Sequence, residues 1–155
     1  MRASERGVTF LELIATAAIL AILASAILPL GQVAAKRQKE LELRRTLRQL
    51  RTSIDRYHQA VEQGLIGGTD VELGSEGYPP DLETLVEGVN QVGQLDHKLK
   101  YLRRIPKDPM TGEAEWGLRC YQDDADSRSW CGSNVWDVYS LSRGEGLDGT
   151  EYRDW

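Results

Sequence analysis

The sequence has few of the residues on which most catalytic and metal sites depend. It contains two cysteines and two histidines among its 155 residues. No histidine lies near Cys120 or Cys131, so the four ligands of a structural zinc site are missing. Neither His58 nor His97 has a Ser or Cys beside it in a nucleophile arrangement, and no glycine loop of the phosphate-binding kind is present. The sequence therefore predicts that the protein is not an enzyme and that both histidines lie at the surface.

Basic and acidic residues are unevenly divided along the chain, whose formal net charge is -5. Residues 31–65 carry eight Lys or Arg against four Asp or Glu, a net charge of +4. Residues 66–155 carry nine Lys or Arg against eighteen Asp or Glu, a net charge of −9. A basic stem with an acidic head suits electrostatic packing of many copies, and it is a poor fit to nucleic-acid binding, where a basic face dominates. A solvated helix beside an acidic domain is the alternative.

The longest apolar run lies near the N-terminus. It covers residues 13–30 and is interrupted only by Thr16, Ser25 and Pro29. Eighteen helical residues extend about 27 Å, which is close to the roughly 30 Å hydrocarbon thickness of a bilayer. The run can therefore span a membrane. Basic residues flank it on both sides, so the positive-inside rule leaves its orientation open.

The apolar run continues into an amphipathic helix. Gly64 predicts the end of this amphipathic helix. Between residues 10 and 63, only Pro29 and Gly31 break helical character. We therefore expect one long helix with a kink near Pro29. Glu40 and Arg44 are spaced for an ion pair along this helix. Apolar residues recur at spacings of four and three and predict a buried stripe: Leu43, Leu47, Leu50, Ile54, Tyr57 and Val61.

Short elements are expected after Gly68. A small helix is predicted from Tyr78-Pro79-Pro80-Asp81 through Val86, with proline in its first turn. Strands are predicted at residues 116–121 and 135–141, on either side of the acidic loop 122–128. Together these elements predict an α+β fold, in which the long helix packs on a small antiparallel sheet.

The two cysteines flank the same acidic loop. If the C-terminal part lies in an oxidising compartment, Cys120 and Cys131 are expected to form a disulfide, which contributes about 2–4 kcal/mol in a small domain. Two unrelated free thiols are the alternative.

A glutamate lies at the start of the apolar run, in the segment Arg6-Gly7-Val8-Thr9-Phe10-Leu11-Glu12-Leu13-Ile14. A carboxylate costs roughly 2.5–3.5 kcal/mol at the bilayer centre on insertion scales, and less near an edge, so Glu12 requires a partner. Cleavage after Gly7 would free an α-amino cation at Val8, about one helical turn from Glu12. This cation can pair with the carboxylate of the same copy or of a neighbour.

This arrangement resembles the class III signal of type IV pilins and pseudopilins. The resemblance covers the leader, Gly7, Thr9, Glu12 and the whole apolar run with Pro29. It implies that a prepilin peptidase cuts after Gly7 on the cytoplasmic side and methylates the new amine of Val8. The family usually has Phe or Met at this first mature position. A signal anchor with an incidental glutamate is the alternative.

Several short segments follow one another in the C-terminal region: Tyr78-Pro79 with Leu82 and Leu85, Tyr101 to Pro109, Trp116-Gly117, Asp137 to Ser140, and Asp148-Gly149-Thr150 through Trp155. In their order and approximate spacing they resemble the major pseudopilin of type II secretion. The resemblance implies a type IV pilin-like fold with four parts. These are a leader (1–7), a membrane-spanning half of the helix that forms the filament core (8–30), an amphipathic half (31–65) and a periplasmic α+β head (66–155).

The resemblance also implies calcium binding in the C-terminal loop, residues 142–155, which follows the last predicted strand. Family members typically have an adjacent acidic pair after the Gly-Thr, where this chain has Tyr152 and Arg153 after Glu151. The alternative is an acidic loop that is stabilised by packing of Tyr152 and Trp155, with Arg143 and Arg153 compensating the carboxylates. The hard oxygen ligands available for calcium are Glu145, Asp148, Glu151 and Asp154.

The function implied by the resemblance is that of an assembly subunit. The chain would wait in the bacterial inner membrane as a single-pass protein with its head in the periplasm. It would then be polymerised into a pseudopilus that drives protein export across the outer membrane. The implied partners are other copies of the chain, minor pseudopilins, the prepilin peptidase and the inner-membrane assembly platform. The alternatives are a type IV pilus subunit and, in another class, a membrane-anchored periplasmic binding or catalytic domain.

Overall fold

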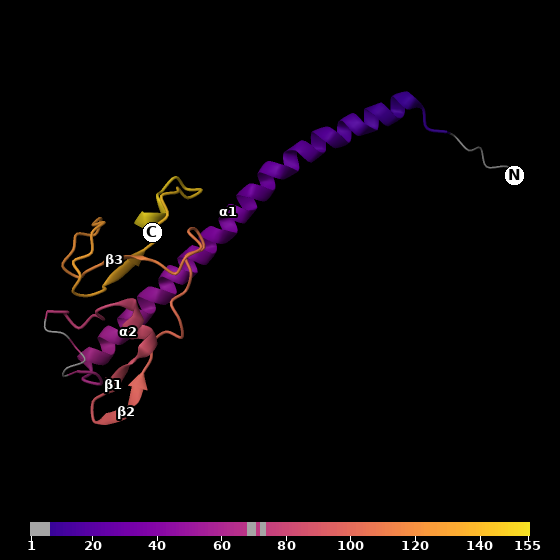
Figure 1. Cartoon of the computed structure of the whole chain (residues 1–155). Coiled ribbons are helices and arrows are strands. Elements are labelled where there is room, and N and C mark those ends of the chain that lie inside the picture. Colours follow the sequence, from indigo (N-terminus) through magenta and orange to yellow (C-terminus); the bar gives the residue numbers. More distant parts are fainter. Residues whose placement is uncertain (1–6, 68–70, 72–73) are drawn as a thin grey trace. The chain divides into compact units, whose positions relative to one another are not determined.

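The computed structural model describes residues 7–67, 71 and 74–155, with the side chains of these residues except at 26–29 and 94–96. The chain divides into two compact units, residues 1–38 and residues 39–155. The predicted leader, residues 1–7, lies outside the described residues except for Gly7. The elements in chain order are α1 (Phe10–Glu62), α2 (Leu82–Glu87), β1 (Val89–Gln91), β2 (Gln94–Leu99), β3 (Gly117–Arg119), β4 (Asp137–Tyr139) and the 3-10 helix η2 (Tyr152–Asp154) (Figure 1).

The first unit contains the N-terminal part of α1, which begins at a capped residue. The Oγ1 of Thr9 accepts a hydrogen bond from the backbone N–H of Glu12 (3.3 Å), and the backbone C=O of Thr9 accepts one from Leu13 (3.1 Å). Thr9 is therefore the N-cap of α1. Glu12 lies in the first turn, where a carboxylate interacts favourably with the positive end of the helix dipole.

The apolar part of α1 in this unit is exposed. Phe10, Leu20 and Leu30 expose 81%, 65% and 69% of their surface. Among the described residues, α1 is the one helix long and apolar enough to span a membrane, and its most apolar 18-residue window has a mean hydropathy of 2.5. The kink predicted near Pro29 falls on a residue whose side chain lies outside the described part of the chain.

In the second unit, α1 forms one side of the hydrophobic core. The predicted stripe is confirmed, because its first five members are buried and Val61 is half-buried against them. Each buried aliphatic side chain stabilises the fold by about 1.5–3 kcal/mol relative to its exposed state. The residues that cover the stripe are Ile66, Leu82, Leu85, Val89, Leu102, Trp116, Val135, Val138 and Tyr152.

Helix α1 ends at the predicted glycine. Gly64 has a φ of 67°, in the left-handed region that a residue without a Cβ adopts at little cost. The N–H of Leu65 donates to the C=O of Ala60, and the N–H of Gly64 donates to that of Val61, which together form a Schellman motif. This turn reverses the chain and places the buried Ile66 against the core.

Helix α2 begins later than predicted. Asp81 is its N-cap, since Oδ1 of this residue accepts hydrogen bonds from the N–H (2.7 Å) and the Oγ1 (2.6 Å) of Thr84. Pro79 and Pro80 therefore precede the helix, and the expectation of a proline in its first turn was wrong. The short polar side chain at residue 81 satisfies the free N–H groups of the first turn better than the preceding prolines do.

Strands β3 and β4 pair antiparallel, as predicted, but each has only three residues. The pairs are Gly117 with Tyr139, Leu118 with Val138, and Arg119 with Asp137. The strand β3 ends earlier than predicted because side chains, and not the partner strand, bind the backbone N–H groups of the next residues. The N–H of Cys120 donates to the Asp123 carboxylate (2.8 Å), and the N–H of Tyr121 donates to the side-chain oxygen of Asn134 (3.0 Å).

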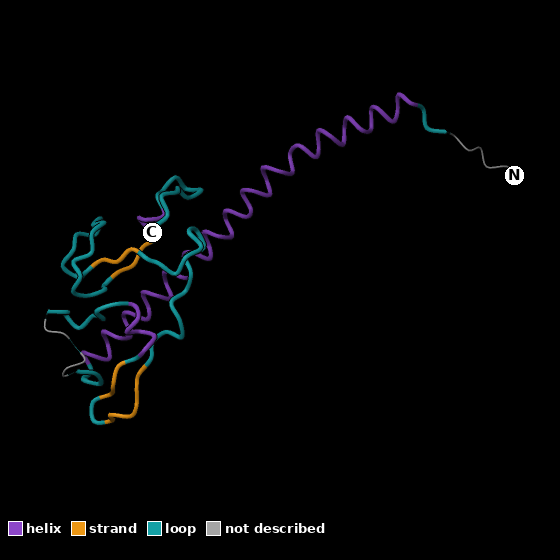
Figure 2. The backbone as a smooth tube through the Cα atoms, in the orientation of Figure 1, coloured by secondary structure: helices purple, strands orange, loops and turns teal. Residues whose placement is uncertain are grey.

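A second hairpin, formed by β1 and β2, was not predicted. Val89 lies opposite Leu99, and Asn90 lies opposite Lys98. The segment is rich in Asn, Gln and Lys and lacks the β-branched alternation that marks a strand. The described strands therefore form two separate two-stranded sheets and not the single sheet expected (Figure 2). The fold is α+β, with a long apolar N-terminal helix and a small antiparallel region.

Candidate functional site

The N-terminal segment presents the predicted processing and assembly residues at the start of α1. Gly7 and Val8 precede the helix, and Val8 exposes 71% of its surface. Glu12 is the only charged residue between positions 8 and 35. The spacing Thr9-x-x-Glu12 is also a capping-box signature, which the sequence analysis did not use. In the described part of the chain, the bond of this motif that is present is the one from the backbone N–H of Glu12 to Thr9, and the Glu12 carboxylate itself forms no hydrogen bond or ion pair.

The C-terminal loop is bound to the second unit's part of α1 by Glu40. This carboxylate is 8% exposed, and its Oε1 accepts hydrogen bonds from the N–H of Leu147 (2.8 Å) and the hydroxyl of Tyr152 (3.1 Å). Burial, together with the hydrogen bond to Glu40, raises the pKa of Tyr152 to about 12. The hydroxyl of Tyr152 is therefore protonated at neutral pH and available as a donor to Glu40.

Two of the loop carboxylates are compensated by arginines. Asp148 pairs with Arg44 at 3.1 Å, so Arg44 does not form the predicted pair with Glu40. Glu151 lies 3.2 Å from Arg153 and 3.5 Å from Arg128. Arg153 is thus a compensating group, as expected, whereas Arg143 forms no ion pair among the described residues.

Local hydrogen bonds order the tip of the loop. The Oγ1 and N–H of Thr150 donate to Asp148 (2.7 and 3.1 Å), and these bonds hold the pKa of this carboxyl below its usual range. The indole N–H of Trp155 donates to the Oγ1 of Thr150 (2.6 Å). Arg44 lies over the ring of Trp155, 4.1 Å from its centroid. These contacts agree with the alternative in which packing of Tyr152 and Trp155 orders the loop.

The four predicted calcium ligands do not gather into one site in this arrangement. In the described part of the chain, the donor atoms of three metal-ligand side chains come together in one group, which consists of Cys120, Asp123 and Cys131. Both sulfurs of that group belong to a disulfide. Calcium prefers six to eight oxygen ligands around one point. Calcium binding therefore stays a prediction of the resemblance. The carboxylates concerned are Glu145, Asp148, Glu151 and Asp154.

The arginine contacts predict that the full chain in detergent melts at the same temperature in excess calcium and in chelator. Arg44, Arg128 and Arg153 already compensate Asp148 and Glu151, two of the four carboxylates, so a cation has less charge repulsion to relieve in the folded loop. A melting temperature that rises with calcium, and a response that is lost in the variant Asp148→Asn with Glu151→Gln, would contradict this expectation and show that calcium binds the folded state.

Cys120 and Cys131 are joined by a disulfide, with their Cα atoms 5.9 Å apart. The bond closes the loop between β3 and β4, and Cys120 is fully buried. The free thiols kept open as an alternative are absent from this structure.

Reduction of this disulfide is expected to lower the free energy of unfolding by about 2–4 kcal/mol, because the open chain regains the entropy of the closed loop. Urea unfolding of the full chain with and without reductant measures the difference. Thiol labelling of the folded, non-reduced protein is the control. Quantitative modification of both cysteines would show that the bond is not formed.

A charged network that the sequence analysis did not identify joins α1 to β3 and β4. Asp137 lies 2.6 Å from Nε of Arg51 and 3.2 Å from a terminal nitrogen of Arg119, whose side chain is 7% exposed. Arg51 also donates to the C=O of Trp155 (2.6 Å), and Arg119 donates to the C=O of Arg153 (3.2 Å). The network therefore fixes the C-terminal residues to the rest of the second unit.

The two histidines differ in environment. His97 is exposed, as predicted. His58 is half-buried and stacks on Tyr78 with the ring centroids 4.2 Å apart, so the expectation of a surface position was wrong for it. The chain returns across α1 after Gly64 and brings Tyr78 against this helix, which the helical pattern alone did not reveal.

Comparisons of the chain with family models, with curated proteins and with solved structures found no match.

Proposed function

We propose that this chain is a pilin-like filament subunit, specifically a pseudopilin of a type II secretion pseudopilus. The observation that carries the proposal is the exposed apolar part of α1, which follows Gly7 and Val8 and contains one charged residue, Glu12. Apolar side chains exposed along several helical turns need lipid or other proteins to cover them. A subunit that passes from a bilayer into a filament core meets this need in both of its states.

The position of Glu12 supports assembly over simple anchoring. An anchor gains nothing from an ionised carboxylate in an apolar segment, because the charge loses hydration on insertion. In a filament, the carboxylate pairs with the ammonium group that cleavage after Gly7 creates at Val8. The prepilin peptidase and the assembly platform would then be the first partners of the chain.

Features of the second unit support a periplasmic location for the head. A disulfide persists in oxidising compartments and is rare in the cytosol. The C-terminal residues are bound to the body of the unit by Glu40 and Arg51, which suits a subunit that must stay folded while it is moved. The head, residues 66–155, is also the acidic part of the chain, with a net charge of −9.

Two other functions agree with some of these observations. A type IV pilus subunit shares the same N-terminal features, and neighbouring genes would separate it from a secretion subunit. A membrane-anchored periplasmic binding or catalytic domain would keep its leader, and it gives no reason for a carboxylate at position 12.

Electron microscopy of cells that produce the full chain tests the proposal. With a prepilin peptidase and an assembly platform present, we expect fibres that an antibody against this chain decorates. Cells without the peptidase are the control and should form none. A chain that is processed but never forms fibres, with both the prepilin peptidase and the assembly platform present, would contradict the filament function.

A further inference from the structure

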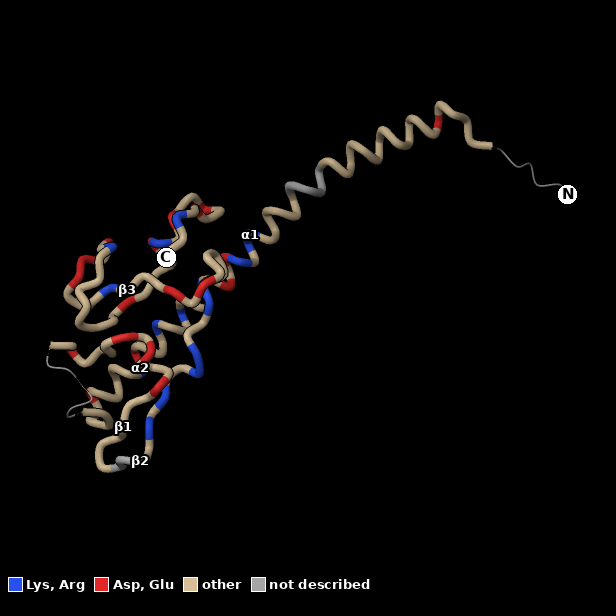
Figure 3. The backbone as a smooth tube through the Cα atoms, in the orientation of Figure 1, with Lys and Arg blue, Asp and Glu red and all other residues tan. Residues whose placement is uncertain are grey.

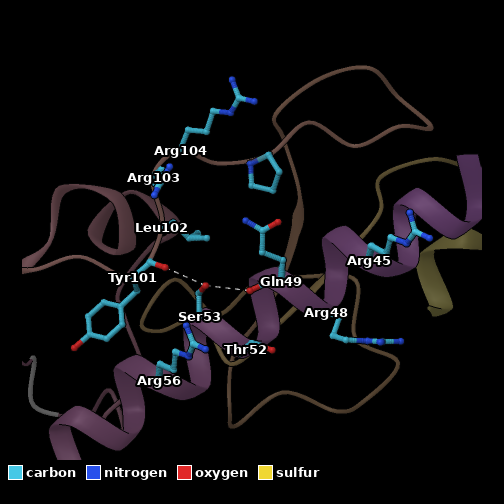
Figure 4. Close-up of a pocket in the computed structure, with 11 residues that line it drawn as sticks. Arg45, Arg48, Gln49, Thr52, Ser53, Arg56, Tyr101, Leu102, Arg103 and Arg104 are labelled. Atoms are coloured by element: carbon cyan, nitrogen blue, oxygen red, sulfur yellow. Dashed lines mark hydrogen bonds between the residues drawn. The ribbon is translucent and has the colours of Figure 1, made fainter.

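A groove with five arginines lies where α1 meets the loop of residues 101–106 in the second unit. Its volume is about 660 Å³. Three of the arginines come from α1 and two from the loop, and all five are exposed (Figure 4). None of them takes part in the contacts described above. The arginines are Arg45, Arg48, Arg56, Arg103 and Arg104.

Among the residues that the structure describes, these arginines lack counter-charges. None of the five forms an ion pair with another residue that the structure describes, whereas the nearby Arg44 and Arg51 both do. Arg45 and Arg48 are three positions apart on α1, and Arg44 and Arg48 are four apart, so their charges repel along the helix. An anionic partner that covers the groove would relieve this repulsion. Guanidinium groups bind carboxylates through paired N–H donors, which favours a carboxylate partner.

Hydrogen bonds hold the floor of the groove in place. The hydroxyl of Ser53 donates a hydrogen bond that is shared between the C=O of Gln49 (3.0 Å) and the C=O of Tyr101 (3.3 Å). The N–H groups of Tyr101 and Leu102 both donate to the C=O of Leu85 at 2.9 Å. A preformed groove avoids the entropy cost of ordering a loop when a partner binds.

We propose that this groove binds the acidic loop, residues 122–128, of a second copy of the chain. Asp124 and Asp126 of the loop are exposed and form no ion pair in the described part of the chain. Tyr121 and Trp130 flank the loop with 55% and 42% of their surfaces exposed, and aromatic rings stack on guanidinium groups. The disulfide closes this loop, so its carboxylates are presented from a constrained backbone.

The positions of the two surfaces favour a contact that repeats. Within the second unit, the acidic loop lies at one edge and the basic segment after β2, which leads into the groove, lies at the opposite edge (Figure 3). Different surfaces of the two partners then meet, which is a heterologous contact, and each added copy leaves one groove and one loop free for the next. The inference rests on the proposed filament function, because such a contact links many copies in a row.

Cysteine cross-linking of the full chain in cell membranes tests the contact directly. Thr52 lines the groove and Ala125 lies in the acidic loop, and both are exposed. With Thr52→Cys and Ala125→Cys in one chain, oxidation should give a ladder of dimers, trimers and longer products. Each single variant is the control and should give no ladder. Absence of the ladder in the double variant would overturn the proposal.

Charge reversal on the double-cysteine background separates specific pairing from chance encounter. Arg48→Glu with Arg56→Glu, and equally Asp124→Arg with Asp126→Arg, should each reduce the ladder by at least about tenfold, because like charges then face each other. Combining the two sets should restore it. Lys98→Glu with Lys100→Glu, on β2 and the adjoining residue outside the groove, makes the same charge change and should leave the ladder intact. A ladder that ignores the reversals, or that the combination does not restore, overturns the proposal.

Other results distinguish this inference from the filament function. If the groove takes a phosphate-bearing ligand, the ladder will be missing and inorganic phosphate will raise the melting temperature, which overturns the proposal. If the wild-type chain forms fibres without a ladder, the groove contact is wrong and the filament function stands. If the leader is retained and no fibres form but the ladder appears, the filament function is wrong and the contact stands.

Discussion

Replacing Asp137 with alanine is expected to lower the free energy of unfolding by about 3 kcal/mol. The carboxylate pairs with Arg51 and with Arg119, and Arg119 is too buried to be hydrated when its partner is removed. Breaking a buried ion pair by removing one partner typically costs about 3–5 kcal/mol, and the partial exposure of Asp137 places this site at the lower end. Since domains are stable by only about 5–15 kcal/mol, urea unfolding of the full chain in detergent should resolve the change.

Asp126→Ala is the matched control. Asp126 is exposed and forms no ion pair with any described residue, so its loss should change the free energy of unfolding by no more than about 0.5 kcal/mol. Equal stability of the two variants would contradict the role assigned to the Arg51–Asp137–Arg119 network.

Replacing Glu12 with alanine is expected to leave the second unit folded and to reduce the yield of filaments by at least about tenfold. Without the carboxylate, the ammonium group of Val8 would be buried unpaired in an apolar filament core, at a cost of about 3–5 kcal/mol. The measurement is the amount of filament sheared from cells, compared at equal amounts of processed subunit. A normal yield would contradict the pairing.

Glu12→Gln separates charge pairing from helix capping. Glutamine serves at this position of a capping box as glutamate does, so a capping role predicts that the glutamine variant assembles normally. Charge pairing predicts that it fails as badly as the alanine variant. The hydrogen bond from the N–H of residue 12 to Thr9 involves the backbone and is retained in both variants.

The parts of the fold that could be predicted from sequence are those set by neighbouring residues. The stripe from Leu43 to Tyr57 is buried because its spacing places the side chains on one face of a helix. The end of α1 at Gly64 follows from the one residue type that adopts the required backbone at little cost. Both features are marked by patterns of residues within a few positions along the chain, even though the residues that cover the stripe are distant in sequence.

The contacts that fix the C-terminal residues could not be predicted in the same way. Glu40 and Tyr152 are 112 positions apart, and Arg51 and Asp137 are 86 apart. No local pattern links such residues, because their pairing depends on how the whole head packs. For the same reason, the compensating role of Arg44 in the C-terminal loop was missed, since local spacing pointed to Glu40 as its partner.

The groove arginines illustrate a different limit. Their excess charge is visible in the sequence as the net charge of +4 in residues 31–65. The fold adds Arg103 and Arg104 from a distant loop and leaves all five without ion pairs among the described residues. Only the tertiary structure shows which basic residues are already neutralised and which remain available to a partner.

The mass of the chain extracted from membranes tests the central claim most directly. A pilin-like subunit that has been processed should lack residues 1–7 and carry one added methyl group on the amine of Val8. Production in a strain without prepilin peptidase should give the unprocessed mass and serves as the control. A chain that keeps its leader in the presence of the peptidase, with no methyl group, would contradict the assignment as a filament subunit and favour a simple membrane anchor.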